Sequence, residues 1–509
     1  MKWKDFRENA EAIIVALLLA LLIRHFVLES YEIPTGSMAP YLHGLNARVE
    51  CPNCGVDTPV GIASDPLTNR VLLSDKYRIL EGTCNKTGVR FKIQADGPNF
   101  ICPGCKETRA VSEVSLRTAV AKPLKVECRE CTFKHETLIE AADVLGGNKI
   151  LVDKLRYDAF EPDRWDVVVF RFNSQRNYIK RLVGLPGEQL QIINGDIWID
   201  GEIEVKPPHV QKHMWIPVHD SSILEAGLIA EAWSIEDGER LLSSWSKDTN
   251  WTRYDAAAAD SDDKVIGGWG FNFSDSEGKL VYSRPVRNYY GYNGNYRGSP
   301  PAPIRDLKVS TQVRAMPRGG DNSAITLEIE NTPSRYQWRI PFNGKKSAFN
   351  IVSKAEKSAT NPDGNPDWEF DFSLRSDVET NLSMEVVDRT VRFFADGELI
   401  GELPLPESEI TAGTGRNAKQ HVRVHVSHCG GYLKQVQIYR DLHWTGNGNY
   451  AVTGPFDIDQ GRYFVLGDNS PSSLDSRYWG SFARSNLLGR GFVIFWPALP
   501  GRNESGFIR

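Results

Sequence analysis

The chain has 509 residues, of which 41% are hydrophobic and 25% are charged, and its formal net charge is −5. This composition is typical of a folded protein, and the length exceeds that of one ordinary core, which predicts roughly two to four domains. The mild negative charge and the lack of a basic tract give no electrostatic basis for binding nucleic acid, so we expect no nucleic-acid partner.

The only long apolar run lies near the amino terminus. Residues 12–28 read AIIVALLLALLIRHFVL, interrupted only by Arg24 and His25. A run of this length is at the short limit for a membrane span. A cleaved secretory signal is the rival interpretation, but it would need a small-residue cleavage site, which the following HFVLESYEIP does not offer. We therefore expect residues 1–28 to form a short stub and one transmembrane anchor.

Basic residues before the run predict its orientation. Lys2, Lys4 and Arg7 precede the apolar residues, and such residues tend to stay on the cytoplasmic side. The sequence thus predicts a single-pass protein of the cell membrane, with a cytoplasmic amino terminus and the rest of the chain on the outer face.

Short β-like segments dominate the chain beyond the anchor. ILVDKL and DVVVFRF are separated by turn residues, and INGD and IDGE are hairpin signals. Helical periodicity is weak, so we expect a mainly β protein. Shifts in composition predict one core in three parts, interrupted by two insertions. The core parts are residues 29–48, 147–204 and 451–509, and the insertions are residues 49–146 and 205–450.

Three motifs fall in the three parts of this core: PTGSMAP (34–40), YIKRLVGLPGE (178–188) and GDNSPSSLDSRYWG (467–480). Taken singly, each motif has an ordinary structural interpretation: the first as a turn, the second as a lysine on an edge strand, and the third as a surface ion pair. Together, in this order and behind an amino-terminal apolar run, they resemble the bacterial type I signal peptidases, the Ser–Lys leader peptidases. The resemblance covers residues 10–48, 147–204 and 451–496.

The resemblance implies a serine endopeptidase that removes signal peptides from exported pre-proteins, with those peptides and the lipid bilayer as partners and no cofactor for catalysis. A serine hydroxyl needs an adjacent base, and lysine can serve only when apolar neighbours lower its pKa. By resemblance, Ser37 is the nucleophile and Lys180 the base, Thr35 donates to the oxyanion, and Ser473 orients the lysine amine. The matched supporting residues are Met38, Arg181, Asp468, Asp475 and Arg477.

Other interpretations stay open. His43 lies six residues from Ser37 and would suit a Ser-His-Asp triad, although no motif surrounds it. An anchored adhesin or glycan-binding protein on a degenerate peptidase core is an alternative from another class. Intact Ser37, Lys180 and Ser473 favour the enzyme.

The first insertion holds seven of the eight cysteines. Six form C-x-x-C pairs, which place two thiolates on one tight turn, as in tetrahedral zinc sites. We therefore expect a zinc-ribbon-like module with structural zinc on Cys51, Cys54, Cys102, Cys105, Cys128 and Cys131. Cys84 and His135 would bring the ligands to eight and allow two sites. Disulfides, which a non-cytoplasmic location permits, are the alternative, and a redox role would rest on the C-x-x-C pairs alone.

The second insertion, residues 205–450, contains many strand-like runs with Gly and Pro turns, including an Asp396-Gly397 hairpin. This pattern predicts a β-sandwich. It is similar to laminin-G or concanavalin-type jelly rolls. Such domains often bind glycans or proteins, which would make one of these the ligand, while many others only pack against their neighbours. Cys429 should be a buried free thiol. Since no proposed reacting group lies in this insertion, we expect it to be dispensable for chemistry.

Overall fold

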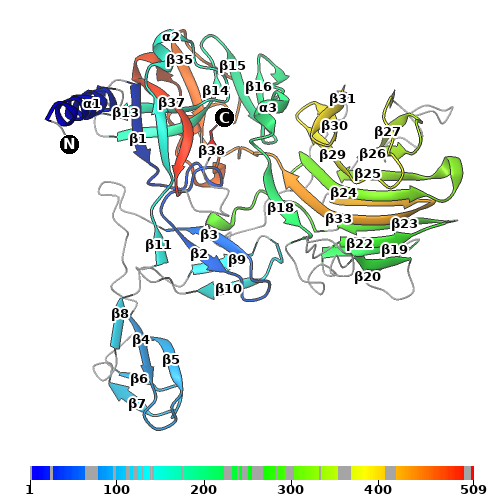
Figure 1. Cartoon of the computed structure of the whole chain (residues 1–509), viewed down its shortest axis with the longest axis horizontal. Coiled ribbons are helices and arrows are strands. Elements are labelled where there is room, and N and C mark those ends of the chain that lie inside the picture. The colour runs from blue at the N-terminus through cyan, green and yellow to red at the C-terminus, as the bar shows by residue number, and fades with distance from the viewer. Residues whose placement is uncertain are drawn as a thin grey trace.

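The computed structural model of the chain is mainly β, as predicted (Figure 1). It describes residues 3–22, 27–62, 78–95, 99–110, 115–118, 124–128, 130–137, 139, 143–173, 176–222, 232–237, 240–243, 250–254, 268–274, 276–282, 284–293, 303–331, 334–353, 368–406, 420–497 and 506–508.

The amino-terminal apolar run forms helix α1 (Trp3–Leu22). Leu28, the last residue of the predicted 12–28 span, instead begins strand β1 (Leu28–Glu32), so the predicted end of the span is wrong. This segment, LESYE, pairs antiparallel with β12 (Lys149–Asp153). Large apolar side chains of α1 are exposed: Ile13, Ile14, Val15, Leu17, Leu18 and Leu19. None of the helices described here meets the length and apolarity that a membrane crossing requires.

The core of the molecule is an eight-stranded antiparallel sheet built from all three predicted core parts. Its order is β1-β12-β37-β13-β14-β35-β36, and β38 adds to β37. The remaining strands are β13 (Val167–Asn173), β14 (Arg176–Gly184), β35 (Arg462–Leu466), β36 (Phe482–Ala483), β37 (Leu487–Trp496) and β38 (Gly506–Phe507). Short helices α2 (Arg156–Ala159) and α6 (Ser476–Trp479) connect its strands.

A small four-stranded sheet packs beside the core sheet. It consists of β15 (Gln189–Ile193), β16 (Asp196–Ile199), β17 (Glu202–Ile203) and β34 (Phe456–Asp457). The predicted INGD and IDGE hairpins are confirmed. Asn194 and Gly195 join β15 to β16, and Asp200 and Gly201 join β16 to β17, all with positive φ. This backbone conformation gives the tight turns of two-residue hairpins.

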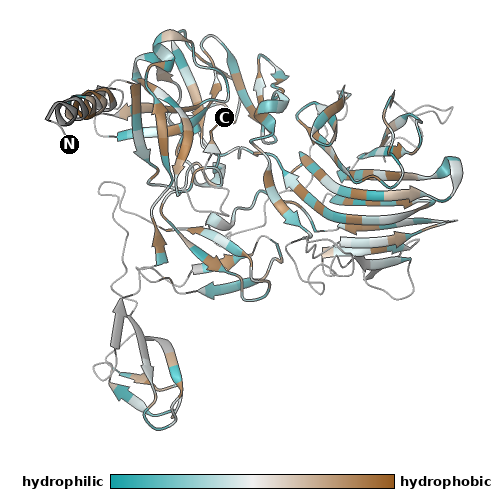
Figure 2. Ribbon diagram, viewed as in Figure 1, coloured by the Kyte–Doolittle hydropathy of each residue, from teal (hydrophilic) through white to brown (hydrophobic). Residues whose placement is uncertain are grey.

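The second insertion forms two antiparallel eight-stranded sheets around one apolar core, which confirms the predicted β-sandwich (Figures 1 and 2). Buried and partly exposed residues alternate along its long strands, as expected for sheets with one face inward. One sheet contains β18 (Ile216–Asp220), β21 (Trp251–Tyr254), β22 (Gly268–Asn272), β24 (Leu307–Pro317), β29 (Thr380–Val387), β30 (Thr390–Ala395), β31 (Glu398–Pro404) and β33 (Cys429–Arg440). The other contains β19 (Trp233–Asp237), β20 (Arg240–Ser243), β23 (Glu277–Tyr282), β25 (Ala324–Asn331), β26 (Ser334–Pro341), β27 (Ser347–Ser353), β28 (Trp368–Phe370) and β32 (Gln420–Ser427).

Two details of the sandwich were predicted correctly. Asp396 and Gly397 form the turn between β30 and β31, both with positive φ. Cys429 is a fully buried free thiol at the start of β33.

The cysteine-rich insertion consists of short strands in two tiers (Figure 1). The tier nearer the core holds β2 (Asn46–Glu50), β3 (Asp57–Gly61), β9 (Leu124–Glu127), β10 (Lys134–Thr137) and β11 (Val144–Leu145). The distal tier holds β4 (Arg78–Thr83), β5 (Arg90–Ala95), β6 (Asn99–Ile101), β7 (Thr108–Ala110) and β8 (Ser115–Thr118).

A buried lysine joins the two ends of the sandwich segment. Lys206 precedes helix α3 (Pro208–Gln211), and its ammonium pairs with Asp388, in the turn between β29 and β30, and with Asp441, just after β33. The Lys206 Nζ–Asp441 oxygen distance is 2.9 Å. All three side chains are buried. The chain therefore enters and leaves the sandwich at one point.

We expect Lys206→Ala to lower the free energy of unfolding by about 3–5 kcal/mol, because it leaves two buried carboxylates without their cation. Arg314→Ala, which breaks an exposed pair with Asp377 in the same sandwich, should change it by less than about 1 kcal/mol. Urea unfolding of the variants measures both values. Equal, small effects would mean that the Lys206 junction does not stabilise the fold.

Candidate functional site

The loop that carries Ser37 leaves strand β1 and is held by a turn. Ala39 N–H donates to Gly36 O at 3.0 Å, and Leu42 N–H donates to Met38 O at 2.9 Å. Met38 and Leu42 are buried in the apolar cluster beneath the core sheet. These anchors leave the Ser37 side chain partly exposed beside the sheet.

Lys180 extends from β14 to Ser37. Its Nζ lies 2.7 Å from Ser37 Oγ and 3.0 Å from Ile179 O. Lys180 is 3% exposed, and its cross-strand neighbour is Val168 of β13. Burial lowers the pKa of Lys180 from near 10.5 to about 8, although Asp475 and Asp468 act in the opposite direction.

Two buried ion pairs surround this lysine without engaging it. Arg181 forms a fork with Asp468, with nitrogen–oxygen distances of 2.8 and 2.7 Å. Arg477 contacts Asp475 at 2.9 Å. Because each carboxylate already has an arginine partner, Lys180 has no ion pair within the described part of the chain. A buried amine without a counter-ion loses its proton more readily than an exposed one.

The Asp475–Arg477 pair also orders the third motif. Asp475 accepts a hydrogen bond from Gly467 N–H at 3.0 Å. Arg477 donates to Thr445 and to Ser470. These hydrogen bonds therefore hold the turn of the third motif next to Ser37.

Ser473 lies in this turn but does not make the predicted contact with Lys180. Its hydroxyl is buried and has no hydrogen-bond partner within the part of the chain that the structure describes. It lies against Gly467, where an added Cβ would be 2.1 Å from Ser473 Oγ and 2.5 Å from Ser37 O. The close approach of the third motif to Ser37 thus depends on glycine at position 467, and Ser473 packs here without orienting the lysine.

Asn469, which sequence reasoning missed, holds the Ser37 loop directly. Its backbone N–H donates to Ser37 O at 3.1 Å, and its side-chain amide donates to Gly36 O at 2.8 Å. It also exchanges two hydrogen bonds of 2.8 Å with the side chain of Asn293. Its position in the GDNS motif, next to Asp468, was the one available signal in the sequence.

Asn293 belongs to residues 284–293, which lie inside the predicted sandwich insertion yet contact the core. The Tyr292 ring covers Gly36, where a Cβ would be 2.0 Å from the ring. The Tyr292 hydroxyl donates to Leu45 O at 2.9 Å, and Tyr290 donates to Asp468 O at 3.0 Å. The insertion therefore supports part of the Ser37 loop. The prediction that residues 205–450 are dispensable for chemistry did not include such contacts.

Among the described hydrogen bonds, none joins His43 or Thr35 to the Ser37 hydroxyl. The His43 ring stacks on Tyr292, with centroids 5.6 Å apart, and burial lowers its pKa to about 4. The hydrogen bond described for Ser37 Oγ joins it to Lys180, so the geometry favours the lysine over a histidine triad. The Thr35 side chain is exposed two residues before Ser37.

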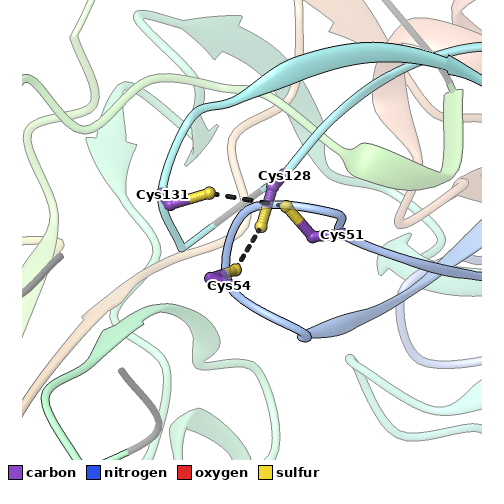
Figure 3. A group of neighbouring side chains, drawn as sticks. All are labelled: Cys51, Cys54, Cys128 and Cys131. Atoms are coloured by element: carbon purple, nitrogen blue, oxygen red, sulfur yellow. Dashed lines mark hydrogen bonds between the residues drawn. The ribbon is translucent and has the colours of Figure 1, made fainter. Parts of the chain in front are cut away.

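The cysteines of the first insertion form two groups rather than one shared site. Cys51, Cys54, Cys128 and Cys131 converge between the β2–β3 and β9–β10 turns (Figure 3). The Cys51–Cys131 and Cys54–Cys128 sulfur distances are 3.6 and 3.5 Å, and all eight cysteines are free thiols. Four sulfurs in such a group could hold one tetrahedral metal ion.

The second group contains Cys84, Cys102 and Cys105. His135, considered above as an eighth ligand, belongs to neither group as described. It stacks on Phe133, and its ring nitrogens have no hydrogen-bond partner among the described residues. The two groups are nested along the chain. The 84–105 group lies within the loop that the 51–131 group closes.

Comparison with known proteins links the core to one family. Residues 130–244 and 407–496 match the family model described as signal peptidase, peptidase S26. Lys180 and Ser473 lie within the matched residues, whereas Ser37 lies outside them.

Curated relatives match over short segments. The chain is 54% identical over 44 residues to the probable signal peptidase I-2 of Synechocystis sp., which is 9% of this chain and 20% of that protein. It is 34% identical over 67 residues to signal peptidase I of Bacillus caldolyticus, covering 13% and 36%. With signal peptidase I of Aquifex aeolicus it shares 49% identity over 41 residues, covering 8% and 16%. The chain thus spans between 16% and 36% of the length of these relatives.

Solved structures give only a weak likeness. The Emp46p carbohydrate recognition domain has a TM-score of 0.26 and 7% identity, covering 41% of this chain and 88% of that chain. SCLam, a non-specific endo-beta-1,3(4)-glucanase, has a TM-score of 0.27 and 10% identity, covering 51% and 97%. These scores are too low to assign a fold or a ligand to the sandwich. The two matched segments, by contrast, are similar to the model of the signal peptidase, peptidase S26 family.

Proposed function

We propose that this protein is a membrane-anchored serine endopeptidase that removes signal peptides from exported pre-proteins through a Ser37–Lys180 dyad. The observation that carries the proposal is the 2.7 Å contact between Lys180 Nζ and Ser37 Oγ, made by a buried lysine whose pKa is lowered to about 8. The peptidase S26 match over the core supports the reaction class. The signal peptidase I relatives support the substrate class.

In the proposed reaction, neutral Lys180 accepts the Ser37 proton as Oγ attacks the scissile carbonyl, and the ammonium then gives a proton to the leaving amine. Water hydrolyses the acyl-enzyme with Lys180 again as base. The Ser37 N–H and the Thr35 hydroxyl are the proposed donors to the oxyanion. Strand β1 edges the core sheet five residues before Ser37, so an extended substrate could pair with it.

We further propose that α1 anchors the protein to the membrane and that the catalytic core lies on the outer face. The exposed apolar side chains of α1 support a lipid contact. The sandwich is proposed to bind a glycan or protein ligand, as its resemblance to laminin-G or concanavalin-type jelly rolls implies.

The two insertions are proposed to differ in their relation to catalysis. The four-cysteine group is proposed to hold one structural zinc ion, because four converging thiols suit tetrahedral zinc. Residues 284–293 are proposed to position the Ser37 loop, so replacing all of 205–450 with a linker would remove a support of the active site.

Ser37→Ala and Lys180→Ala should each lower kcat/KM for a signal-peptide substrate by at least about 10³-fold, since each removes half of the reacting pair. His43→Phe, which keeps a ring stacked on Tyr292, should retain activity. The wild-type kcat/KM should rise with pH to a plateau above about 8, as Lys180 loses its proton. Full activity of Lys180→Ala, or a loss in His43→Phe equal to that in Ser37→Ala, would refute the dyad.

Replacing Lys180 with Met should change how stability depends on pH. Burial lowers the Lys180 pKa to about 8, while the unfolded chain keeps a value near 10.5. Between these values the unfolded state binds more protons, so the stability of the wild type rises with pH. We expect wild type to gain roughly 3 kcal/mol relative to Lys180→Met as pH rises from 8 to 10.5. Urea unfolding across this range measures the gain. Ser37→Ala, which keeps the lysine, should follow the wild type, and a pH-independent difference for Lys180→Met would contradict the neutral lysine.

Asn293→Ala should lower kcat about 10- to 100-fold with little change in KM, because a displaced Ser37 loop misaligns the nucleophile. Asn293 acts through Asn469, so the Asn293→Ala and Asn469→Ala double variant should be no slower than Asn469→Ala alone. Steady-state kinetics of the three variants, with melting curves to show that each is folded, tests this. Additive losses in the double variant would mean that Asn293 does not act through Asn469.

A further inference from the structure

Four turns of the cysteine-rich insertion share one backbone pattern. In each, the first residue's N–H donates to the carbonyl five residues later, and the N–H of the fifth residue donates back to the first carbonyl. The first residues are Cys51, Cys84, Cys102 and Cys128, and all eight hydrogen bonds measure 2.8 to 3.0 Å. The fifth residue has positive φ in every turn, at Gly55, Gly88, Lys106 and Thr132. These are four copies of one metal-knuckle geometry.

Three of the four turns place cysteine at the fourth position, and one does not. Cys54, Cys105 and Cys131 occupy that position in their turns, while Thr87 occupies it in the turn that begins at Cys84. The turns pair as two nested sets. The outer set brings together four sulfurs, and the inner set brings together the three sulfurs of Cys84, Cys102 and Cys105.

Thr87 faces the inner sulfurs. A Cβ added at Gly104 would be 2.5 Å from Thr87 Oγ1 and 3.1 Å from Cys84 Sγ, so both atoms lie against the same glycine. The Thr87 hydroxyl hydrogen-bonds to the Cys84 sulfur. The cysteines at 84 and 102 are buried, whereas Thr87 is exposed to solvent. The fourth corner of the inner group thus opens toward water.

The carboxylate of Glu107 lies close to the inner group but is paired with Lys86. Its Oε2 lies 3.8 Å from Cys105 Sγ, while its Oε1 pairs with Lys86 at 2.5 Å. Within the residues that the structure describes, no histidine, cysteine or carboxylate completes the three-sulfur group.

We propose that the inner group binds a second zinc ion through the thiolates of Cys84, Cys102 and Cys105, with the fourth coordination position open to a water molecule beside Thr87. Three protein ligands and one exchangeable solvent ligand make a zinc site accessible to small exogenous ligands, in contrast to the closed four-thiolate site. The inner zinc is consequently the more weakly held of the two. This inference is independent of the peptidase activity.

Metal release from the purified full-length protein tests the proposal. The wild type should contain two zinc ions per chain and release them to a chromogenic chelator in a fast and a slow phase. Thr87→Cys completes the fourth ligand and should slow the fast phase by at least about tenfold, since a thiolate replaces a solvent ligand. Thr87→Val, the matched control without a ligand atom, should keep the fast phase. Cys102→Ser should lose it and keep the slow phase, which also shows that the outer site remains folded.

Cobalt substitution gives a second readout. Imidazole should change the visible spectrum of the cobalt-loaded wild type and of Thr87→Val, but not that of Thr87→Cys. One zinc ion per chain in fully reduced protein, or a wild-type cobalt spectrum insensitive to imidazole, would overturn the proposal. The proposal would also be overturned if Glu107→Gln accelerated the fast phase of zinc release and Thr87→Cys left it unchanged. Glu107 would then be the fourth ligand.

Discussion

The candidate site depends on a buried lysine, Lys180, that has no counter-ion among the described residues. A buried ammonium is stabilised when a carboxylate lies beside it, as Lys206 is by Asp388 and Asp441, and such a lysine stays protonated. Lys180 is equally buried, but the nearby carboxylates of Asp468 and Asp475 are each paired with an arginine. Two lysines in one chain thus have opposite pKa shifts for one physical reason, the presence or absence of a free carboxylate. The arginine pairs favour a neutral Lys180 beside Ser37.

The Ser37 loop receives its support from distant parts of the chain. Asn469 holds the carbonyls of Gly36 and Ser37 and is itself held by Asn293. Tyr292 packs on Gly36, and Gly467 allows the third motif to approach the Ser37 backbone. The sandwich is therefore an insertion in the sequence, but residues of this insertion contact the core directly. Its entry and exit meet at Lys206 and Asp441, while residues 284–293 return to the active-site loop. This arrangement couples the sandwich insertion to the position of Ser37.

Local features of the sequence predicted the mainly β fold, the two-sheet sandwich and the hairpins, because Asn-Gly and Asp-Gly turns and alternating strands carry their conformation within a few residues. The motifs also identified the residues that meet at Ser37 and Lys180. Contacts across long separations were missed, since nothing near Asn293 indicates a partner 176 residues away. The Ser473 contact was wrong because that hydroxyl faces Gly467. Cysteine spacing could not distinguish nested from sequential pairs. The predicted anchor extended into strand β1 because Leu28 continues the apolar run in the sequence.

The titration of Lys180 is the most direct test of the proposed mechanism. The chemical shift of the Lys180 ε-carbon in lysine-labelled protein reports the titration, and the absence of this signal in Lys180→Met assigns it. A midpoint near pH 8, coincident with the midpoint of the rise in kcat/KM, is the predicted result. A Lys180 that titrates near 10.5 would remain protonated beside Ser37 at neutral pH, and it would contradict the role of this lysine as the base.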